Sequence, residues 1–263
     1  RPGYMGLYFS RGVTYFLSQQ FDNAVSDFDK YIRKEPKDPS AYLNRGASYL
    51  FLGDTLKAVS DYNKAIRLDR FDPEGYVRRG RVYASQNKYD LAIADMDKAI
   101  ELDTTNTFAY FNRAIMYYEQ ERYNEAMKDL NRVLRDEPGN ALTLYNRGLI
   151  NAQLGAYEDA LDDMDRVLNI NPENVLAYFN RASIFIEMGL YRNALEDYDK
   201  TIELYPDFAK AYMNRAYVHG MLGNKKASKA DYDTAQKKIR EYREKNSTDA
   251  ESFADTTKKY SSL

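Results

Sequence analysis

The side chains that could do chemistry in this chain are carboxylates, guanidinium groups and amides, because it has no cysteine and a single histidine, His219. The lack of cysteine excludes thiolate nucleophiles, disulfides and cysteine-ligated metals. No glycine-rich phosphate loop, HExxH motif or GxSxG motif occurs. His219 falls in a row of aromatic residues, and we interpret it as a core residue rather than a catalytic or metal-binding one. These residue types predict a protein that binds, without a cofactor and without catalysis.

The composition is that of a folded chain with balanced charge. The 263 residues include 38 basic and 40 acidic side chains, so the formal net charge is −2. This balance gives no reason to expect nucleic acid as a partner. Charged residues make up 30% and hydrophobic residues 44%, which excludes a disordered chain. No apolar run reaches the roughly 18 residues that a membrane-spanning helix needs.

A spacing of 34 residues organises the sequence through seven successive units. Two rows of opposite charge follow this spacing, and a small residue comes directly after each Arg. The Arg row is Arg11, Arg45, Arg79, Arg113, Arg147, Arg181 and Arg215, and the Asp row is Asp27, Asp61, Asp95, Asp129, Asp163, Asp197 and Asp231. Because the carboxylates recur with the repeat, we interpret them as architectural.

Each unit is predicted to form two antiparallel helices. In the second unit Tyr42, Arg45 and Tyr49 recur at the spacing of one helix face, Gly53 interrupts the pattern, and Ala58 begins a second face. Neither helix can bury its apolar stripe alone, so the units must stack on one another.

This pattern resembles the tetratricopeptide repeat family over roughly residues 5 to 242. The resemblance implies an all-α fold, a right-handed superhelical array of antiparallel helix hairpins (an α-solenoid). The expected repeats are 5–38, 39–72, 73–106, 107–140, 141–174, 175–208 and 209–242, followed by a polar extension over 243–263 that could hold a short helix. The family usually has Leu where this chain has its Arg row, so here the sequence departs from the pattern.

The Arg row is explained best by ion pairs, because a cation buried alone would be costly. Residues equally far from the turn of a hairpin lie side by side, which predicts structural pairs within each repeat. The predicted pairs are Arg45 with Asp61, Arg113 with Asp129, and Arg181 with Asp197. A pair with the next repeat, Asp61 with Arg79, is the alternative. An anion-binding role for the Arg row is a further alternative, although the Asp row already satisfies it.

A ligand groove is predicted one position before the Arg row, where the family lines its concave surface. The candidate residues are the polar row Asn44, Arg78, Asn112, Asn146, Asn180 and Asn214 and the neighbouring rings Phe9, Phe111, Tyr118, Tyr145, Phe179 and Tyr217. The amides resemble the asparagine ladder of O-linked N-acetylglucosamine transferases, which grips the backbone of an extended peptide. An amide both donates and accepts, so it can bind a peptide unit without reading its side chain. The alternative is that the Asn residues are solvated and idle.

The carboxylate clamp of co-chaperones, which holds the acidic tails of heat-shock chaperones, is a narrower possibility. Asn44 and Arg78 match two of its places, but Glu74 and Ser10 stand where that motif has Lys and Asn. We therefore do not favour it.

The two ends of the chain give further expectations. Lys225, Ser228, Gln236 and Lys238 make the seventh repeat polar, as expected of a terminal repeat that faces water. Thr248 and Glu251 could cap a short helix after it. Pro2 shares the 34-residue register of Pro36, which predicts that a further helix hairpin precedes Arg1 in the parent protein.

Together these observations predict a non-catalytic protein–protein interaction scaffold that binds a protein or an extended peptide in a concave groove. The alternative is a structural spacer or self-assembly module of a larger, possibly enzymatic, protein. The sequence does not identify the partner or the compartment.

Overall fold

The computed structural model describes residues 5–245, which form α-helices joined by short turns, with no strand among them. Residues 1–4 and 246–263, which include the expected cap at Thr248 and Glu251, lie outside the described residues. The helices divide into two units, residues 1–138 and 139–263.

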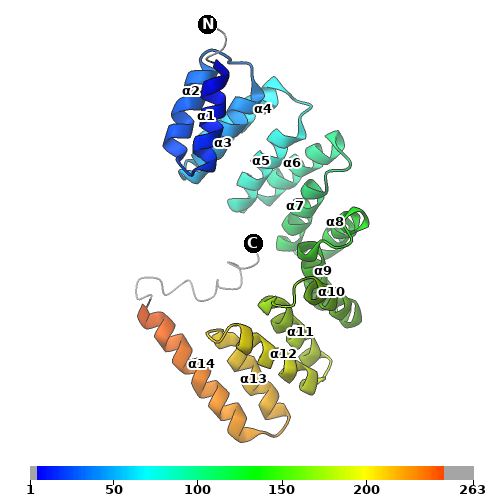
Figure 1. Ribbon diagram of the computed structural model, residues 1–263. Coiled ribbons are helices and arrows are strands. Elements are labelled where there is room, and N and C mark those ends of the chain that lie inside the picture. The colour runs from blue at the N-terminus through cyan, green and yellow to red at the C-terminus, as the bar shows by residue number, and fades with distance from the viewer. Residues whose placement is uncertain (1–4, 246–263) are drawn as a thin grey trace. The chain divides into compact units, whose positions relative to one another are not determined.

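Unit 1 contains eight helices that pack as four consecutive pairs (Figure 1). Its helices are α1 (Met5–Leu17), α2 (Phe21–Ile32), α3 (Pro39–Phe51), α4 (Thr55–Leu68), α5 (Pro73–Ser85), α6 (Tyr89–Leu102), α7 (Thr107–Glu119) and α8 (Tyr123–Asp136). Within the unit, the second helix of each pair also packs on the first helix of the next pair.

Unit 2 contains six described helices that pack in the same way as three pairs. Its helices are α9 (Ala141–Gln153), α10 (Tyr157–Ile170), α11 (Val175–Glu187), α12 (Tyr191–Leu204), α13 (Ala209–Met221) and α14 (Lys225–Lys245). The fourteen described helices confirm the prediction of an all-α α-solenoid built from helix hairpins.

The turns inside the hairpins repeat one backbone conformation. One residue of each turn has a positive φ, and four of the seven are glycines, which adopt it without strain. They are Gln19, Gly53, Asn87, Glu121, Gly155, Gly189 and Gly223, each 34 residues after the last. Many of the first helices have a side-chain cap at their N-terminus. Asp38, for example, accepts a hydrogen bond from the backbone N–H of Ser40 at the start of α3.

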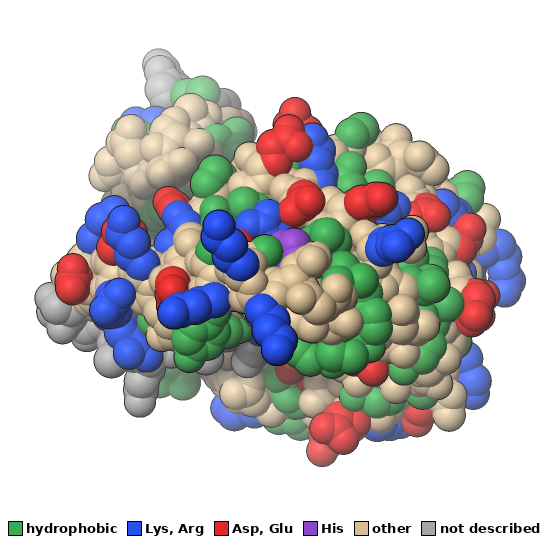
Figure 2. Space-filling model, turned by 90° about the horizontal axis from the view of Figure 1, so that it is seen from below, with side chains coloured by type: hydrophobic (Ala, Val, Ile, Leu, Met, Phe, Trp, Pro, Cys, Tyr) green, Lys and Arg blue, Asp and Glu red, His purple; other side chains and the backbone are tan. Residues whose placement is uncertain are grey.

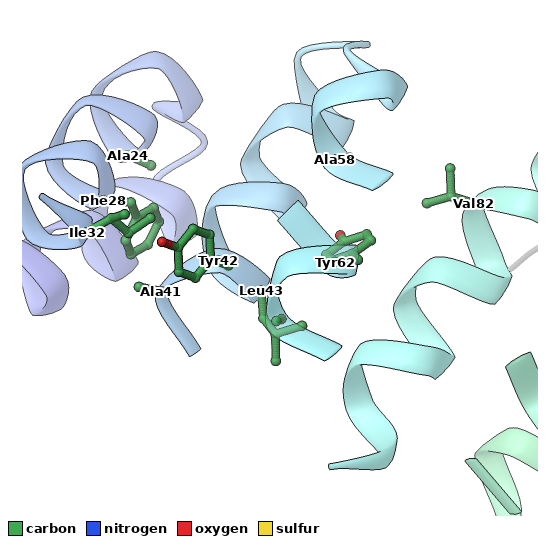
Figure 3. Packing of buried hydrophobic residues seen from close by; sticks show 10 residues of the cluster. Ala24, Phe28, Ile32, Ala41, Tyr42, Leu43, Ala58, Tyr62 and Val82 are labelled. Carbon is green, nitrogen blue, oxygen red and sulfur yellow. The ribbon is translucent and has the colours of Figure 1, made fainter. Parts of the chain in front are cut away.

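The core depends on small residues that let paired helices approach closely. Figure 3 shows this for the first repeats, where Ala24, Ala58 and the ring of Tyr62 lie between helices. A Cβ atom added to Gly46 would lie 2.7 Å from the ring of Tyr62, which is almost completely buried. The row of small residues therefore sets how near the first and second helix of a hairpin can come.

Candidate binding face and its charged frame

Each predicted Arg–Asp pair forms within one hairpin, with two parallel hydrogen bonds. Arg45 donates to Asp61 through Nε (2.8 Å) and Nη2 (2.6 Å). The corresponding Nη2 bonds from Arg113 to Asp129 and from Arg181 to Asp197 are both 2.7 Å. These bidentate contacts fix the guanidinium plane, because the fork of Arg matches a carboxylate.

Within a pair, the Asp side chain is more deeply buried than the Arg side chain. The side chain of Asp129 is 7% exposed and that of Arg113 is 17% exposed. The hydrogen bonds that Arg113 donates to Asp129 and Asp97 raise the pKa of Arg113. At the start of unit 1, the hydrogen bond from Arg11 lowers the pKa of Asp27. The cations of this row are therefore held in the charged state inside the frame of the hairpins.

A second contact, which sequence reasoning missed, ties five described members of the Arg row to the preceding repeat. Nη1 of Arg45 donates to Asp29 (2.6 Å), two residues after the Asp that pairs with Arg11. This second row of acceptors has the same 34-residue spacing and was recognisable from it. Its described contacts are Asp29 with Arg45, Asn63 with Arg79, Asp97 with Arg113, Asp165 with Arg181 and Asp199 with Arg215.

The alternative pairing of Asp61 with Arg79 does not form, because Arg79 donates to Asp95 of its own hairpin (2.6 Å). The link between these two repeats runs instead from Arg79 to the amide oxygen of Asn63 (2.5 Å). Each of these five Arg residues thus connects two neighbouring second helices, so its donors are engaged by protein oxygens rather than open to an anionic ligand.

Aromatic rings flank most of these guanidinium groups. The carbon at the centre of the Arg113 guanidinium lies 5.5 Å from the ring centre of Tyr110 and 5.8 Å from that of Tyr117. The fifth repeat differs, because Leu144 and Asn151 occupy the flanking positions of Arg147. Asn151 is buried and donates to Asp163 (3.3 Å), so an amide replaces the ring there.

The row of amides before the Arg row falls into two groups. In the first group, Asn44, Asn112 and Asn146 are half-buried, and each Nδ2 donates to the carbonyl four residues earlier. The distances are 2.8, 2.7 and 2.8 Å. Within the described part of the chain their Oδ1 atoms have no hydrogen-bond partner. One N–H is thus used for orientation, and a donor and an acceptor remain.

In the second group the amides support buried tyrosines. Asn180 donates to the hydroxyl of Tyr145 (2.6 Å), and Asn214 donates to that of Tyr198 (3.1 Å). Tyr198 is completely buried. These two amides serve the packing of neighbouring hairpins in unit 2, because a buried hydroxyl needs a partner.

Arg78, the cation in the amide row, is largely neutralised by its own helix. Its Nε donates to Glu74 (2.6 Å), and its Nη1 reaches the carbonyl of Leu43 (3.4 Å). The carboxylate of Glu74 therefore already pairs with Arg78, the cation that a carboxylate clamp would use.

The predicted rings differ in accessibility. Tyr145 and Phe179 are buried, with Phe179 packed 4.8 Å from Phe208. Phe9 packs on Phe28 in the first core cluster. Tyr145 and Phe179 therefore leave little ring surface for a ligand, and the partly buried ring of Phe9 is engaged in core packing.

The remaining rings offer more surface. Phe111 is half-buried, and so is Tyr118, which packs 5.8 Å from Tyr123, whereas Tyr217 is 53% exposed. Sequence reasoning missed two apolar side chains, Phe108 (49% exposed) and Leu142 (38% exposed). They lie one turn before Asn112 and Asn146, and their 34-residue spacing was the available signal.

His219 follows the row of aromatic residues as a half-buried side chain, with its Nε2 3.8 Å from Asp231. Among residues 5–245, no group of three or more His, Cys, Asp or Glu side chains is placed to hold a metal ion. None of the helices in that range is sufficiently long and apolar to span a membrane.

Stacked helix hairpins with a 34-residue period define a helical repeat protein, and comparison with known families agrees. Models described as tetratricopeptide repeat match residues 9–73, 43–107, 96–128, 115–174 and 175–208. The chain belongs to the tetratricopeptide repeat family. Arrays of this family typically act as non-catalytic protein-interaction scaffolds.

Solved structures of other repeat proteins have the same fold. The C-terminal part of a tetratricopeptide repeat protein from Cytophaga hutchinsonii has a TM-score of 0.72 and 18% identity, over 86% of this chain and 93% of that one. A repeat protein from Parabacteroides merdae has a TM-score of 0.68 and 16% identity, over 89% and 92%. YrrB, described as having an unusual peptide-binding site, has a TM-score of 0.61 and 23% identity, over 70% and 95%. No curated protein matches the sequence significantly.

Proposed function

We propose that the first helices of unit 1 and of unit 2 bind an extended peptide segment of a protein partner on the face that carries Asn44, Asn112 and Asn146 (the Asn face), without catalysing a reaction on it. The observation that carries this proposal is the common geometry of Asn44, Asn112 and Asn146. In each, the bond from Nδ2 to the preceding turn fixes the amide and leaves Oδ1 without a partner among the described residues. Such an amide can accept one backbone N–H of a peptide and donate one N–H to its carbonyl.

Apolar neighbours add contact area to these amides. Phe108 precedes Asn112 by one helical turn, and Leu142 precedes Asn146 in the same way. Accessible aromatic and aliphatic anchors beside polar groups are typical of peptide-binding surfaces. We therefore assign backbone recognition to the amides and part of the binding energy to Phe108 and Leu142. YrrB, a repeat protein of similar fold that is described as having a peptide-binding site, supports this assignment.

The alternative function is a spacer or self-assembly module of a larger protein. It predicts no peptide ligand for the Asn face, so the same experiment distinguishes the two.

The experiment selects ligands from a library of random 12-mer peptides displayed on phage, with the complete 263-residue chain as bait. Selected peptides are then titrated by calorimetry against the wild type, against Asn112→Ala with Asn146→Ala, and against Asn169→Ala. Asn169 is an exposed amide on α10 that serves as the matched control. We expect the double variant to weaken binding by about tenfold and the control to leave it unchanged.

Backbone recognition has its own signature. N-methylation of single peptide bonds in a selected ligand should weaken binding more than alanine substitution of its polar side chains. If the ligands are insensitive to both the double variant and N-methylation, the Asn face does not bind peptide backbone and the proposal is wrong.

A further inference from the structure

The last described hairpin carries an open apolar hollow that lies outside the Asn face, although Tyr217 of the predicted groove lines it. It lies between α13 and α14, has a volume of about 610 Å³, and is lined by residues that include Met213, Tyr217, Met221, Lys229 and Tyr232. Tyr217, Met221 and Tyr232 are each half-exposed. Figure 2 shows hydrophobic and basic side chains next to one another around the histidine of α13. The polar substitutions in this repeat thus surround an apolar surface rather than replace it.

Within unit 2, the same surface of the preceding hairpin is covered by a helix. Tyr198 stands 34 residues before Tyr232 and is completely buried, because α13 packs over it. Helix α13 contributes Ala211 and Val218, both with no exposed area, and the amide of Asn214 bonds the Tyr198 hydroxyl. The hollow is therefore built as an acceptor for a helix of the α13 type.

A charged group marks the same place. Asp199 on α12 accepts a hydrogen bond from Nη1 of Arg215 on α13 (2.7 Å). The residue 34 positions later is Asp233 on α14, which is exposed and forms no ion pair within the described range. Asp233 is thus an acceptor of the second row without its Arg.

Four of the first helices that pack on such faces share one stripe, whereas α3 has Ser48 at its last position. A small residue is followed four residues later by Arg and seven residues later by an aliphatic residue. The described examples are Gly75, Arg79 and Val82; Ala109, Arg113 and Met116; Ala177, Arg181 and Ile184; and Ala211, Arg215 and Val218.

We propose that the α13–α14 face binds an amphipathic helix of another protein with this stripe, whose Arg pairs with Asp233 and whose aliphatic residue enters the hollow beside Tyr232. The small residue is required because the two helices approach closely. At the equivalent place in unit 1, a Cβ atom on Gly75 would lie 2.8 Å from Ile66.

Two other occupants fit less well. Residues 246–263 contain no arginine to pair with Asp233. The first helix of a second copy has Arg11, but it presents Leu7 where every other first helix in the stripe has a residue no larger than Thr. A partner helix with Ala or Gly there avoids this overlap.

The test uses the complete chain and a fluorescein-labelled, helix-stapled peptide of residues 209–221 as the probe, read by fluorescence anisotropy. We expect Asp233→Arg in the chain to weaken binding of the probe by about tenfold. A probe that carries Arg215→Asp should bind this variant with the original affinity, because the two charges are exchanged. Tyr232→Ala should weaken binding through lost apolar contact. Glu244→Arg, an exposed charge change on the same helix, is the matched control. Thermal unfolding of each variant checks that α14 remains folded.

Three results would each overturn the proposal. The first is no binding, or binding that neither Asp233→Arg nor Tyr232→Ala weakens. The second is binding only after residues 246–263 are deleted, which would make that segment the occupant. The third is self-association of the chain, measured by light scattering, that Asp233→Arg abolishes and Arg11→Asp with Asp233→Arg restores, which would make a second copy the occupant.

Discussion

Asn214 donates a hydrogen bond of 3.1 Å to the hydroxyl of Tyr198, a tyrosine with no exposed surface. The amide 68 residues earlier, Asn146, instead bonds the carbonyl of Leu142 on its own helix (2.8 Å). Two residues in the same register of the repeat therefore have different roles. One completes a buried hydrogen-bond network, and the other remains available at the surface.

This difference predicts that the same substitution has unequal effects at the two positions. Asn214→Ala should lower the free energy of unfolding by about 1–3 kcal/mol, because it leaves the Tyr198 hydroxyl with one partner fewer in the core. Asn146→Ala should change it by less than about 0.5 kcal/mol. Urea unfolding followed by circular dichroism measures both, and equal losses would show that the two amides are equivalent.

The Arg–Asp frame predicts a rescue. Asp129→Ala should lower the free energy of unfolding by about 2–3 kcal/mol, because Arg113 keeps Asp97 but loses its buried carboxylate. Replacing both partners, by Arg113→Leu with Asp129→Leu, should recover most of that loss. Thermal unfolding of the single and the double variant, compared with the wild type, tests this prediction. A harmless Asp129→Ala would mean that Arg113 is fully solvated after the change.

Tyr31 predicts a dependence on alkaline pH. Its hydroxyl donates to Asp38 (2.8 Å), and this bond raises the pKa of Tyr31 to about 12. Since the folded pKa lies above the usual value of about 10, the bond contributes stability that is complete below pH 10 and lost as pH rises toward 12. Tyr31→Phe should remove this contribution, so the variant should lose less stability than the wild type between pH 10 and pH 12. Chemical unfolding across that range is the measurement; parallel curves would contradict it.

The second row of acceptors predicts that the contacts between repeats are unequal. Arg79 meets the neutral amide of Asn63, whereas Arg113 meets the carboxylate of Asp97. Asn63→Asp should raise the free energy of unfolding by about 0.5–1 kcal/mol, and Asp97→Asn should lower it by a similar amount, because both contacts are partly exposed to solvent. Urea unfolding at low and high salt tests this, since the difference should shrink as salt increases.

Much of the fold follows from periodicity, and part of the site does not. The steps from Arg11 to Arg215 predict helix hairpins because each unit repeats the same apolar spacing. Distance from the turn also places Arg45 opposite Asp61, where the structure has them. The link from Arg45 to Asp29 needs the stacking of successive hairpins, which a rule for single hairpins does not contain.

The amide row illustrates the limit more clearly. Asn146 and Asn180 each follow an aromatic residue and precede an Arg, yet of the two only Asn180 reaches a tyrosine hydroxyl of the preceding hairpin. The outcome depends on which residue the adjacent repeat places 35 positions earlier, Tyr145 for Asn180. Register alone therefore identifies candidates for a binding face but not which of them are already occupied.

The shared Arg residues also determine how unit 1 responds to mechanical load. Arg45, Arg79 and Arg113 each join the second helices of two neighbouring repeats, so a pulling force passes from hairpin to hairpin through these bonds as well as through the apolar contacts. Three such fasteners lie within unit 1, to Asp29, Asn63 and Asp97, and the middle one is a neutral amide. Stretching of unit 1 should therefore begin to separate the hairpins at Asn63 and Arg79, because a single amide in place of a carboxylate makes this link the weakest of the three.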